Sequence, residues 1–279
     1  MEFDLRKPVL SSSYWTRHAK NVNAPVRNPD FYGACIIAMM KSETRVALVT
    51  GGARRVGAAI VRSLAMAGWD VAFTFRLAQK QALLLQTELS SAGARVLPLT
   101  ADFDRLEQSI AMIRERFIKW SPRLDLLVNS ASAYGPDRQL SAEAAMRTNY
   151  IAPNRLIESF RNELTSAKGN VINLLDILAE RPMASHANYC ASKAALWNAT
   201  LSWARTLAPD VRVNGIAPGV VNWPDEFPLA DREKYLKKVP LARAGTPDDV
   251  AKLVQFLVED GTYITGQVIR LDGGRSIVN

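Results

Sequence analysis

The sequence predicts a doubly wound α/β fold, in which helices cover both faces of one parallel sheet of seven strands. From residue 45 onward, short runs rich in β-branched residues or leucine alternate strictly with longer amphipathic segments. The strand segments are almost continuously apolar, which is typical of parallel strands buried on both faces. Right-handed crossovers between such strands place helices on both sides of the sheet. At 279 residues, of which 48% are hydrophobic, the chain can bury a core of this size.

Seven apolar runs predict the strands, and six amphipathic segments between them predict the helices. The strands are expected at "RVALVT" (45–50), "DVAFTF" (70–75), "ARVLPLT" (94–100), "LDLLVN" (124–129), "GNVINLL" (169–175), "VRVNGIAPG" (211–219) and "GQVIRLDGG" (266–274). The helices are expected over about 57–68, ending at Gly68, and over 78–91, 105–119, 141–165, 187–208 and 247–259. Ligands of such folds bind beyond the carboxyl ends of the strands.

Two segments depart from this alternation. Residues 222–240 carry proline and charge, so we expect a mobile flap over the ligand site. Residues 1–43 lack lasting periodicity, and their apolar run at 31–40 is too short to span a bilayer. The acids in "MEFDLRKPVL" argue against a secretory signal. We expect a flexible extension there, or an upstream start that the cell does not use, followed by one domain over 44–279.

Composition and charge exclude other classes of function. The formal charge is +8, but the basic residues are scattered and form no run interleaved with aromatics, so no nucleic-acid or membrane partner is expected. Cys35 and Cys190 lie far apart, and His18 and His186 are the only histidines, so we expect no metal site. Two isolated cysteines fit a reducing compartment, the cytoplasm. The charge favours an anionic small molecule.

The turn "TGGARRVG" (50–57) is the first candidate ligand site. Its glycines permit a tight turn, and a helix opening at Gly57 offers free N–H groups to a phosphate. The common GxGxxG fingerprint is absent, so an ordinary strand-to-helix turn would also explain the motif. The residues expected to bind a dinucleotide here are Gly51, Arg54, Arg55, Val56 and Gly57.

The end of the second strand favours NADPH as that dinucleotide. An NAD-specific site places a carboxylate there, whereas this strand ends in Arg76. With Arg54 or Arg55, Arg76 would supply positive charge to a 2′-phosphate. The alternative is that Arg76 is an ordinary surface cation with no role in binding. Further cofactor contacts are expected after the third and fourth strands, where Asp102 could accept from an adenine amino group, Asn129 could brace the backbone, and the small Ser130 and Ala131 leave room for cofactor.

"YCASK" (189–193) is the candidate for proton chemistry. Tyr189 and Lys193 lie four residues apart on a predicted helix, so their side chains share one face. A nearby ammonium stabilises a phenolate, so we expect Lys193 to lower the pKa of Tyr189. A solvent-facing helical pair is the alternative, because this spacing is common.

Taken together, these motifs resemble those of the short-chain dehydrogenase/reductase family. "TGGARRVG", "LTADF", "LLVNSAS", Asn149 in "MRTNYIAP", "YCASK", "VNGIAPG" and "YITGQVIRLDGG" follow the family's order and spacing over about residues 44–277. The resemblance implies a Rossmann-type, usually tetrameric protein that carries out NAD(P)-dependent hydride transfer. It also implies Tyr189 as proton donor, Lys193 on the nicotinamide ribose, Asn149 supporting a proton-relay water, and Pro218 and Gly219 at the cofactor.

Two departures from the commonest family pattern resemble the pteridine reductase branch. Arg55 stands where most relatives have a third glycine, and Asp176 stands at the position of the catalytic serine. An ionised carboxylate cannot donate a hydrogen bond to a ketone oxygen as serine does. The branch also has a serine followed two residues later by an aromatic, matched by Ser132 and Tyr134. The resemblance implies that Arg55 and Ser132 contact cofactor phosphate and pterin, and that Tyr134 stacks on the pterin opposite the nicotinamide. Asp176 and Tyr189 are also expected to contact the substrate.

The sequence therefore predicts an NADPH-dependent reductase of a pterin or dihydrofolate-type substrate, homotetrameric and cytoplasmic. One alternative is a reductase of 3-oxoacyl thioesters or other carbonyls, against which Asp176 and Arg55 argue. The other is a noncatalytic NADPH-binding regulator on the same fold. A regulator would not need the Tyr189, Lys193 and Asn149 set.

Overall fold

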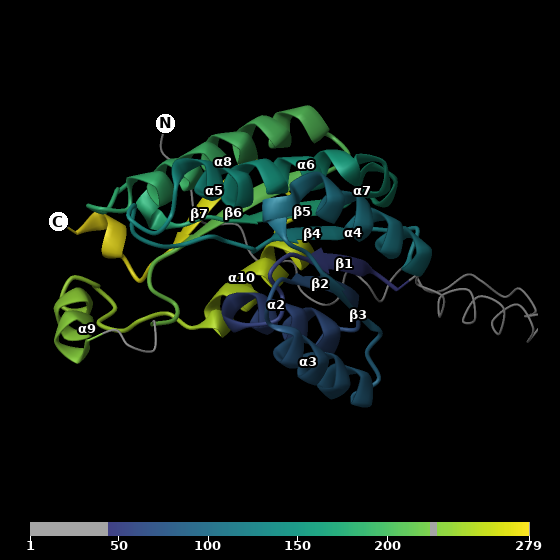
Figure 1. The fold of residues 1–279 in the computed structure, drawn as a ribbon, viewed down its shortest axis with the longest axis horizontal. Helices are drawn as coiled ribbons and strands as arrows, with labels where there is room; N and C mark the ends of the chain where they lie inside the picture. Colours follow the sequence, from purple (N-terminus) through teal and green to yellow (C-terminus); the bar gives the residue numbers. More distant parts are fainter. Residues whose placement is uncertain (1–43, 224–227, 279) are drawn as a thin grey trace, which may run out of the picture. The chain divides into compact units, whose positions relative to one another are not determined.

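The computed structural model describes residues 44–223 and 228–278, which are built around a seven-stranded parallel sheet (Figure 1). The strand order is β3-β2-β1-β4-β5-β6-β7, and every neighbouring pair is parallel. The strands are β1 (Val46–Val49), β2 (Asp70–Phe75), β3 (Val96–Thr100), β4 (Leu126–Asn129), β5 (Asn170–Leu174), β6 (Arg212–Pro218) and β7 (Val268–Leu271). This confirms the predicted sheet. The winding reverses between β1 and β4, the point at which such folds hold ligands.

Helices cover both faces of the sheet, as predicted (Figure 1). One layer consists of α2 (Arg55–Met66), α3 (Gln79–Ser91) and α10 (Pro247–Glu259). The other consists of α4 (Leu106–Trp120), α5 (Ala142–Met146), α6 (Ala152–Ser159), α7 (Arg161–Ala167) and α8 (Ala187–Leu207). Short turns of helix lie at η2 (Phe103–Arg105), η4 (Ile177–Ala179) and η5 (Arg275–Ile277), and α9 (Leu229–Leu236) follows β6.

Each helical layer buries its own apolar core against the sheet. Beneath α2 and α10, side chains such as Ile60, Leu64 and Val254 are fully or almost fully buried. On the other face, the rings of Phe117 in α4 and Phe160 after α6 meet edge to face at 5.1 Å. The amphipathic periodicity read from the sequence reflects these two cores.

The predicted helix over 141–165 is wrong in detail, because the structure divides it into four pieces. Residues Arg147–Ile151 form a π-helical turn, η3, between α5 and α6. Pro153 has no N–H with which to bond the carbonyl of Asn149 four residues earlier, so a regular α-helical ladder cannot continue through this point. A second break follows at Phe160, whose φ is −107° and ψ is 15°. Asn149 therefore lies in an irregular turn.

Other boundaries differ slightly from the prediction. Helix α2 begins at Arg55 rather than residue 57 and ends at Met66. The described part of the 222–240 segment contains α9, and the flap's mobility stays a prediction. The predicted flexible extension over 1–43 lies outside the described residues. In the described ranges, no helix has the length and apolarity needed to cross a membrane.

Candidate active site

Tyr189, Asp176 and Lys193 meet where β5 ends and α8 begins. Tyr189 and Lys193 lie in the first two turns of α8, and Asp176 lies two residues beyond β5. The Tyr189 hydroxyl donates to Asp176 Oδ2 at 2.8 Å, and Lys193 Nζ donates to the carbonyl oxygen of Leu174 at 2.8 Å. Tyr189 is 4% exposed and Lys193 2% exposed. The structure thus brings three predicted catalytic side chains together in a buried cluster.

Burial and the Asp176 charge control the protonation of this cluster. Burial raises the pKa of Tyr189 well above 10, and the negative charge of Asp176 and the hydrogen bond to it raise it further. Burial lowers the pKa of Lys193 to about 8, and the Asp176 charge partly opposes that shift. Burial also raises the pKa of Asp176. Hydrogen bonds from the Leu178 N–H and the Tyr189 hydroxyl stabilise its anion and partly offset that rise. A phenol of raised pKa keeps its proton at neutral pH.

The expected lowering of the Tyr189 pKa by Lys193 is wrong for this structure. The Lys193 ammonium lies 5.9 Å from the centroid of the Tyr189 ring and donates to a backbone carbonyl. Asp176, which is hydrogen bonded to the phenol, has the opposite effect on its pKa. The arrangement therefore favours a proton donor over a phenolate base.

Asn149 clamps the segment after β4 against α8. Its amide nitrogen donates to Ala133 O and Ser192 Oγ, each at 2.9 Å. Its amide oxygen accepts from Ala133 N at 2.8 Å and from Ser132 Oγ at 3.2 Å. All four hydrogen-bonding positions of the side chain are occupied. The side chain therefore positions Ser132, and the water relay that the family resemblance implies stays a prediction.

The side chain of Tyr134 lies at the open side of this cluster. Its ring meets the Tyr189 ring edge to face at 4.9 Å and stacks on the His186 ring at 5.4 Å. Tyr134 is 57% exposed, so a flat ligand can reach its ring. Asp137 accepts hydrogen bonds from the first N–H groups of α8, at Ala187 and Asn188, and so ties the Tyr134 loop to this helix. His186 contributes an aromatic surface that the sequence reading did not anticipate.

The turn "TGGARRVG" leaves no room for side chains at its glycines. A Cβ on Gly57 would lie 2.2 Å from the Gly51 carbonyl oxygen, and one on Gly51 would lie 2.9 Å from Ala131 Cα. Thr50 Oγ1, which the prediction omitted, accepts from the N–H groups of Ser130 and Ala131 and so joins β1 to β4. Glycine is therefore required at these two positions for the turn to pack as closely as it does.

Arg54 and Arg55 lie exposed at the start of α2. Arg55 has φ 51°, in the left-handed region that favours glycine, as expected for the position where most relatives carry one. Neither guanidinium makes a hydrogen bond or ion pair with another residue of the described ranges. Both are therefore available to a phosphate at the helix N-terminus.

Arg76 lies at the other side of this cradle, among carboxylates. Its Nη1 is 3.3 Å from Asp104 Oδ2 and 3.9 Å from Asp102 Oδ1. Asp102 also accepts from the Asp104 N–H, and Arg147 pairs with Asp104 at 3.2 Å. Exposed pairs of this kind contribute little stability, so Arg76 can turn to another anion at low cost. The contact of Asp104 with Arg76 could not be predicted from the sequence, in which Asp104 is notable only for lying two residues after Asp102.

The remaining predicted cofactor residues occupy the ends of β4 and β6. The Asn129 side chain donates to Asn173, which donates to Thr200 in α8. Asn129 was predicted to brace the backbone, but these hydrogen bonds join it to other side chains. Gly219, after Pro218, packs so closely on Asp272 that a Cβ would lie 3.0 Å from the Asp272 Cβ. These contacts fix where the strand ends lie.

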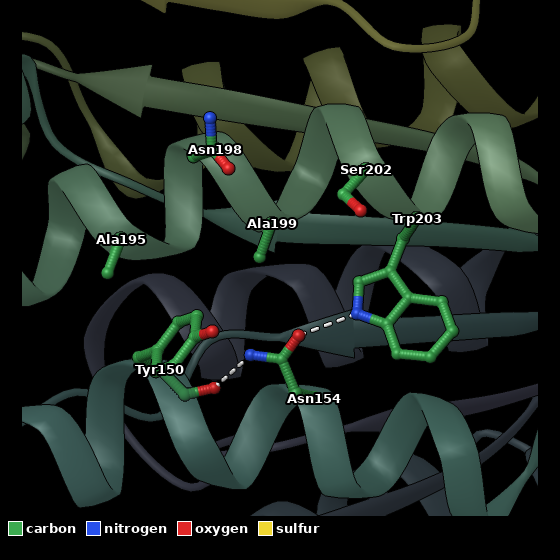
Figure 2. A pocket seen from close by; sticks show the side chains of 7 residues that line it. All are labelled: Tyr150, Asn154, Ala195, Asn198, Ala199, Ser202 and Trp203. Carbon is green, nitrogen blue, oxygen red and sulfur yellow. Dashed lines mark hydrogen bonds between the residues drawn. The ribbon is translucent and has the colours of Figure 1, made fainter.

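A separate groove of about 430 Å³ lies between α8 and the helical segment formed by η3 and α6 (Figure 2). In Figure 2, Asn154 joins the two sides, accepting from Trp203 Nε1 at 2.6 Å and donating to the Tyr150 carbonyl at 2.5 Å. None of its lining residues belongs to the cluster around Tyr189. The groove is therefore distinct from the candidate active site.

Comparison with known families gives one match that covers most of the chain. Residues 51–276 match a family model described as enoyl-(acyl carrier protein) reductase. Among characterised proteins, pteridine reductase 1 of Leishmania tarentolae is 28% identical over 285 residues, covering 83% of this chain and 96% of that protein. A 3-oxoacyl-acyl-carrier-protein reductase of Staphylococcus aureus is 32% identical over 241 residues, covering 83% and 98%.

A solved structure resembles this chain over the same extent. It is the crystal structure of a blue fluorescent protein from a metagenomic library in complex with NADPH. The two chains are 33% identical and superpose with a TM-score of 0.75, covering 83% of this chain and 97% of the other.

Proposed function

The chain belongs to the short-chain dehydrogenase/reductase family of oxidoreductases, and from this premise we propose that it reduces a pterin or dihydrofolate-type substrate with NADPH. One observation carries the choice of substrate. Asp176, half-buried and within 2.8 Å of the Tyr189 hydroxyl, stands where a carbonyl reductase needs a donor. A carboxylate accepts hydrogen bonds, which suits the N–H groups of a pterin and not the oxygen of a ketone. The resemblance to pteridine reductase 1 supports the same choice.

The cofactor cradle fits NADPH. The turn around Gly51 leads into the N-terminus of α2, whose free N–H groups can bind a pyrophosphate, and Arg54 and Arg55 offer guanidinium groups. Arg76 would bind the 2′-phosphate in place of its surface pairing with Asp104. When bound, NADPH supplies the hydride. The NADPH complex of the similar structure supports this cofactor.

The chain's own residues then handle the proton and the substrate's orientation. Tyr189 keeps its proton at neutral pH and supplies it to the reduced ring. Asp176 holds the phenol through Oδ2, and each carboxylate oxygen keeps a lone pair for a substrate N–H. Tyr134 offers its exposed ring face to the flat heterocycle. Lys193, in α8 and hydrogen bonded to the last carbonyl of β5, would hold the nicotinamide ribose.

The direct test is to follow NADPH oxidation with dihydrobiopterin, dihydrofolate and an acetoacetyl thioester side by side. We expect kcat/KM to be highest for one of the two pterins. Faster turnover of the thioester would instead establish the carbonyl reductase that the Staphylococcus aureus relative represents. NADPH binding without turnover of any of these substrates would favour the noncatalytic regulator. On the family resemblance, we also propose that the protein is a homotetramer in the cytoplasm. Sedimentation analysis tests the oligomeric state.

Substituting Arg76 should change the choice of cofactor. Loss of a charged hydrogen bond, about 1.5–3 kcal/mol, should raise the KM for NADPH about 10- to 100-fold in Arg76→Gln. The KM for NADH should stay the same, because NADH lacks the 2′-phosphate. Arg116→Gln, which removes an exposed arginine of α4, is the matched control. An equal loss with both cofactors, or a preference of the unmodified chain for NADH, would refute the assignment.

A further inference from the structure

Two arginines converge on one neutral oxygen near the C-terminal turn η5. Arg181 Nη1 donates to the carbonyl oxygen of Val278 at 2.8 Å, and Arg275 Nη1 donates to the same oxygen at 3.0 Å. Two positive charges therefore lie close together around an acceptor that carries no charge. Like charges repel at this range, so the pair gains from any anion that joins it.

The carboxylate side chains of the described residues do not neutralise the pair. Glu180 makes a two-pronged salt bridge with Arg270, at 2.7 and 2.8 Å. Asp272 accepts from the backbone N–H groups of Gly274 and Ser276. Within the described ranges, no carboxylate lies within ion-pair distance of Arg181 or Arg275. The acids that could have served as counter-charges thus bind other groups.

Most donors of the two guanidiniums remain unused. Each guanidinium has five N–H donors, and the Val278 carbonyl occupies one on each. Arg275 Nε is buried and has no partner among the described residues. Arg181 is exposed, so a ligand can reach the pair from solvent. A carboxylate, with two oxygens in one plane, matches donors of this geometry.

The pair lies at the substrate end of the protein. Arg181 is the fifth residue after Asp176, and the Arg275 guanidinium lies 5.7 Å from the centroid of the Tyr235 ring. The Tyr235 hydroxyl accepts from Val220 N–H, two residues after β6, and the charges of Asp176 and Arg275 both act on its pKa. Figure 1 shows α9 and the yellow C-terminal turn that carries Arg275 at the same end of the sheet.

We propose that Arg181 and Arg275 bind a carboxylate on the tail of the substrate. The inference rests on the proposed function, and it narrows the substrate to a pterin with an acidic tail, such as a dihydrofolate, over one with an uncharged tail. Asp176 and Tyr189 recognise the ring, and the two arginines recognise the far end of the molecule. Recognition at both ends selects for the charge of the tail.

The test compares dihydrofolate with dihydrobiopterin in Arg181→Gln and Arg275→Gln. Loss of one charged contact should raise the KM for dihydrofolate about tenfold and leave that for dihydrobiopterin within about twofold. p-Aminobenzoylglutamate, which has the carboxylates without the pterin, should inhibit the unmodified enzyme competitively and the variants weakly. At saturating NADPH, added salt should raise the KM for dihydrofolate and leave that for dihydrobiopterin unchanged. Arg205→Gln, at the far end of α8, is the matched control and should change neither KM.

The outcomes separate this inference from the function on which it rests. If neither pterin is reduced, the proposed function fails. If both are reduced and the two KM values change together or not at all, the arginine pair serves only to hold Val278, and this inference alone fails. Should Arg275→Gln unfold, the exposed Arg181 still decides the question, because Arg181→Lys should recover part of the dihydrofolate affinity.

Discussion

Replacing Tyr189 with phenylalanine should lower kcat by about 10²–10⁴-fold, the range observed for loss of a positioned proton donor. The hydroxyl donates to Asp176 and keeps its proton at neutral pH, and no other phenol hydrogen bonds with Asp176 in the described ranges. The phenylalanine ring retains the edge contact with Tyr134 at the pocket, so the fold and NADPH binding should survive. Steady-state turnover and the fluorescence of bound NADPH measure the two effects separately.

Tyr263→Phe is the matched control for this variant. Tyr263 is fully exposed, so removing its hydroxyl should change neither turnover nor cofactor binding. Near-normal turnover in Tyr189→Phe would exclude it as the proton donor. Loss of NADPH binding along with turnover would instead show that the tyrosine supports the cofactor site.

Replacing Asp176 with serine should depress pterin reduction by about 10- to 100-fold, the effect of losing a charged hydrogen-bond partner of about 1.5–3 kcal/mol. It should also move the alkaline limit of activity. The Lys193 ammonium, with a pKa of about 8, is lost as pH rises through that value. Since the Asp176 charge raises this pKa, its removal should lower it, and the fall in kcat/KM should begin at a lower pH.

Asp176→Asn separates the effect of charge from that of shape. It keeps the size of the side chain, so the shift of the pH profile should remain while packing around Leu178 changes less than in the serine variant. If Asp176→Ser leaves pterin activity intact and removes carbonyl activity, the chain belongs to a carbonyl-reducing branch of the family. The pH profile of kcat/KM and the substrate comparison therefore test two different consequences of one carboxylate.

The sheet could be predicted from the sequence because its strands are apolar on both faces and alternate with amphipathic helices. Tyr189 and Lys193 could be placed together because residues four apart on a helix share one face. Hydrophobic periodicity did not reveal that the predicted 141–165 helix is divided. Pro153, which cannot donate a backbone hydrogen bond, was the residue that could have indicated the break.

The contacts that sequence reasoning missed join residues far apart in the chain. His186 reaches Tyr134 and Ser192 reaches Asn149 only once the fold is formed. The pKa of Tyr189 was mistaken in direction because burial cannot be read from the Tyr-x-x-x-Lys spacing. Local spacing identifies which groups share a site, and the surrounding structure decides their protonation.

The left-handed backbone of Arg55 implies a trade-off between folding and recognition. Glycine adopts a φ of 51° freely, whereas a residue with a Cβ is destabilised there by about 1 kcal/mol or more. Folding alone would favour glycine at this position. An arginine in this conformation is consistent with a role for its charge. Without a bound anion, the turn is less stable than the same turn with glycine would be.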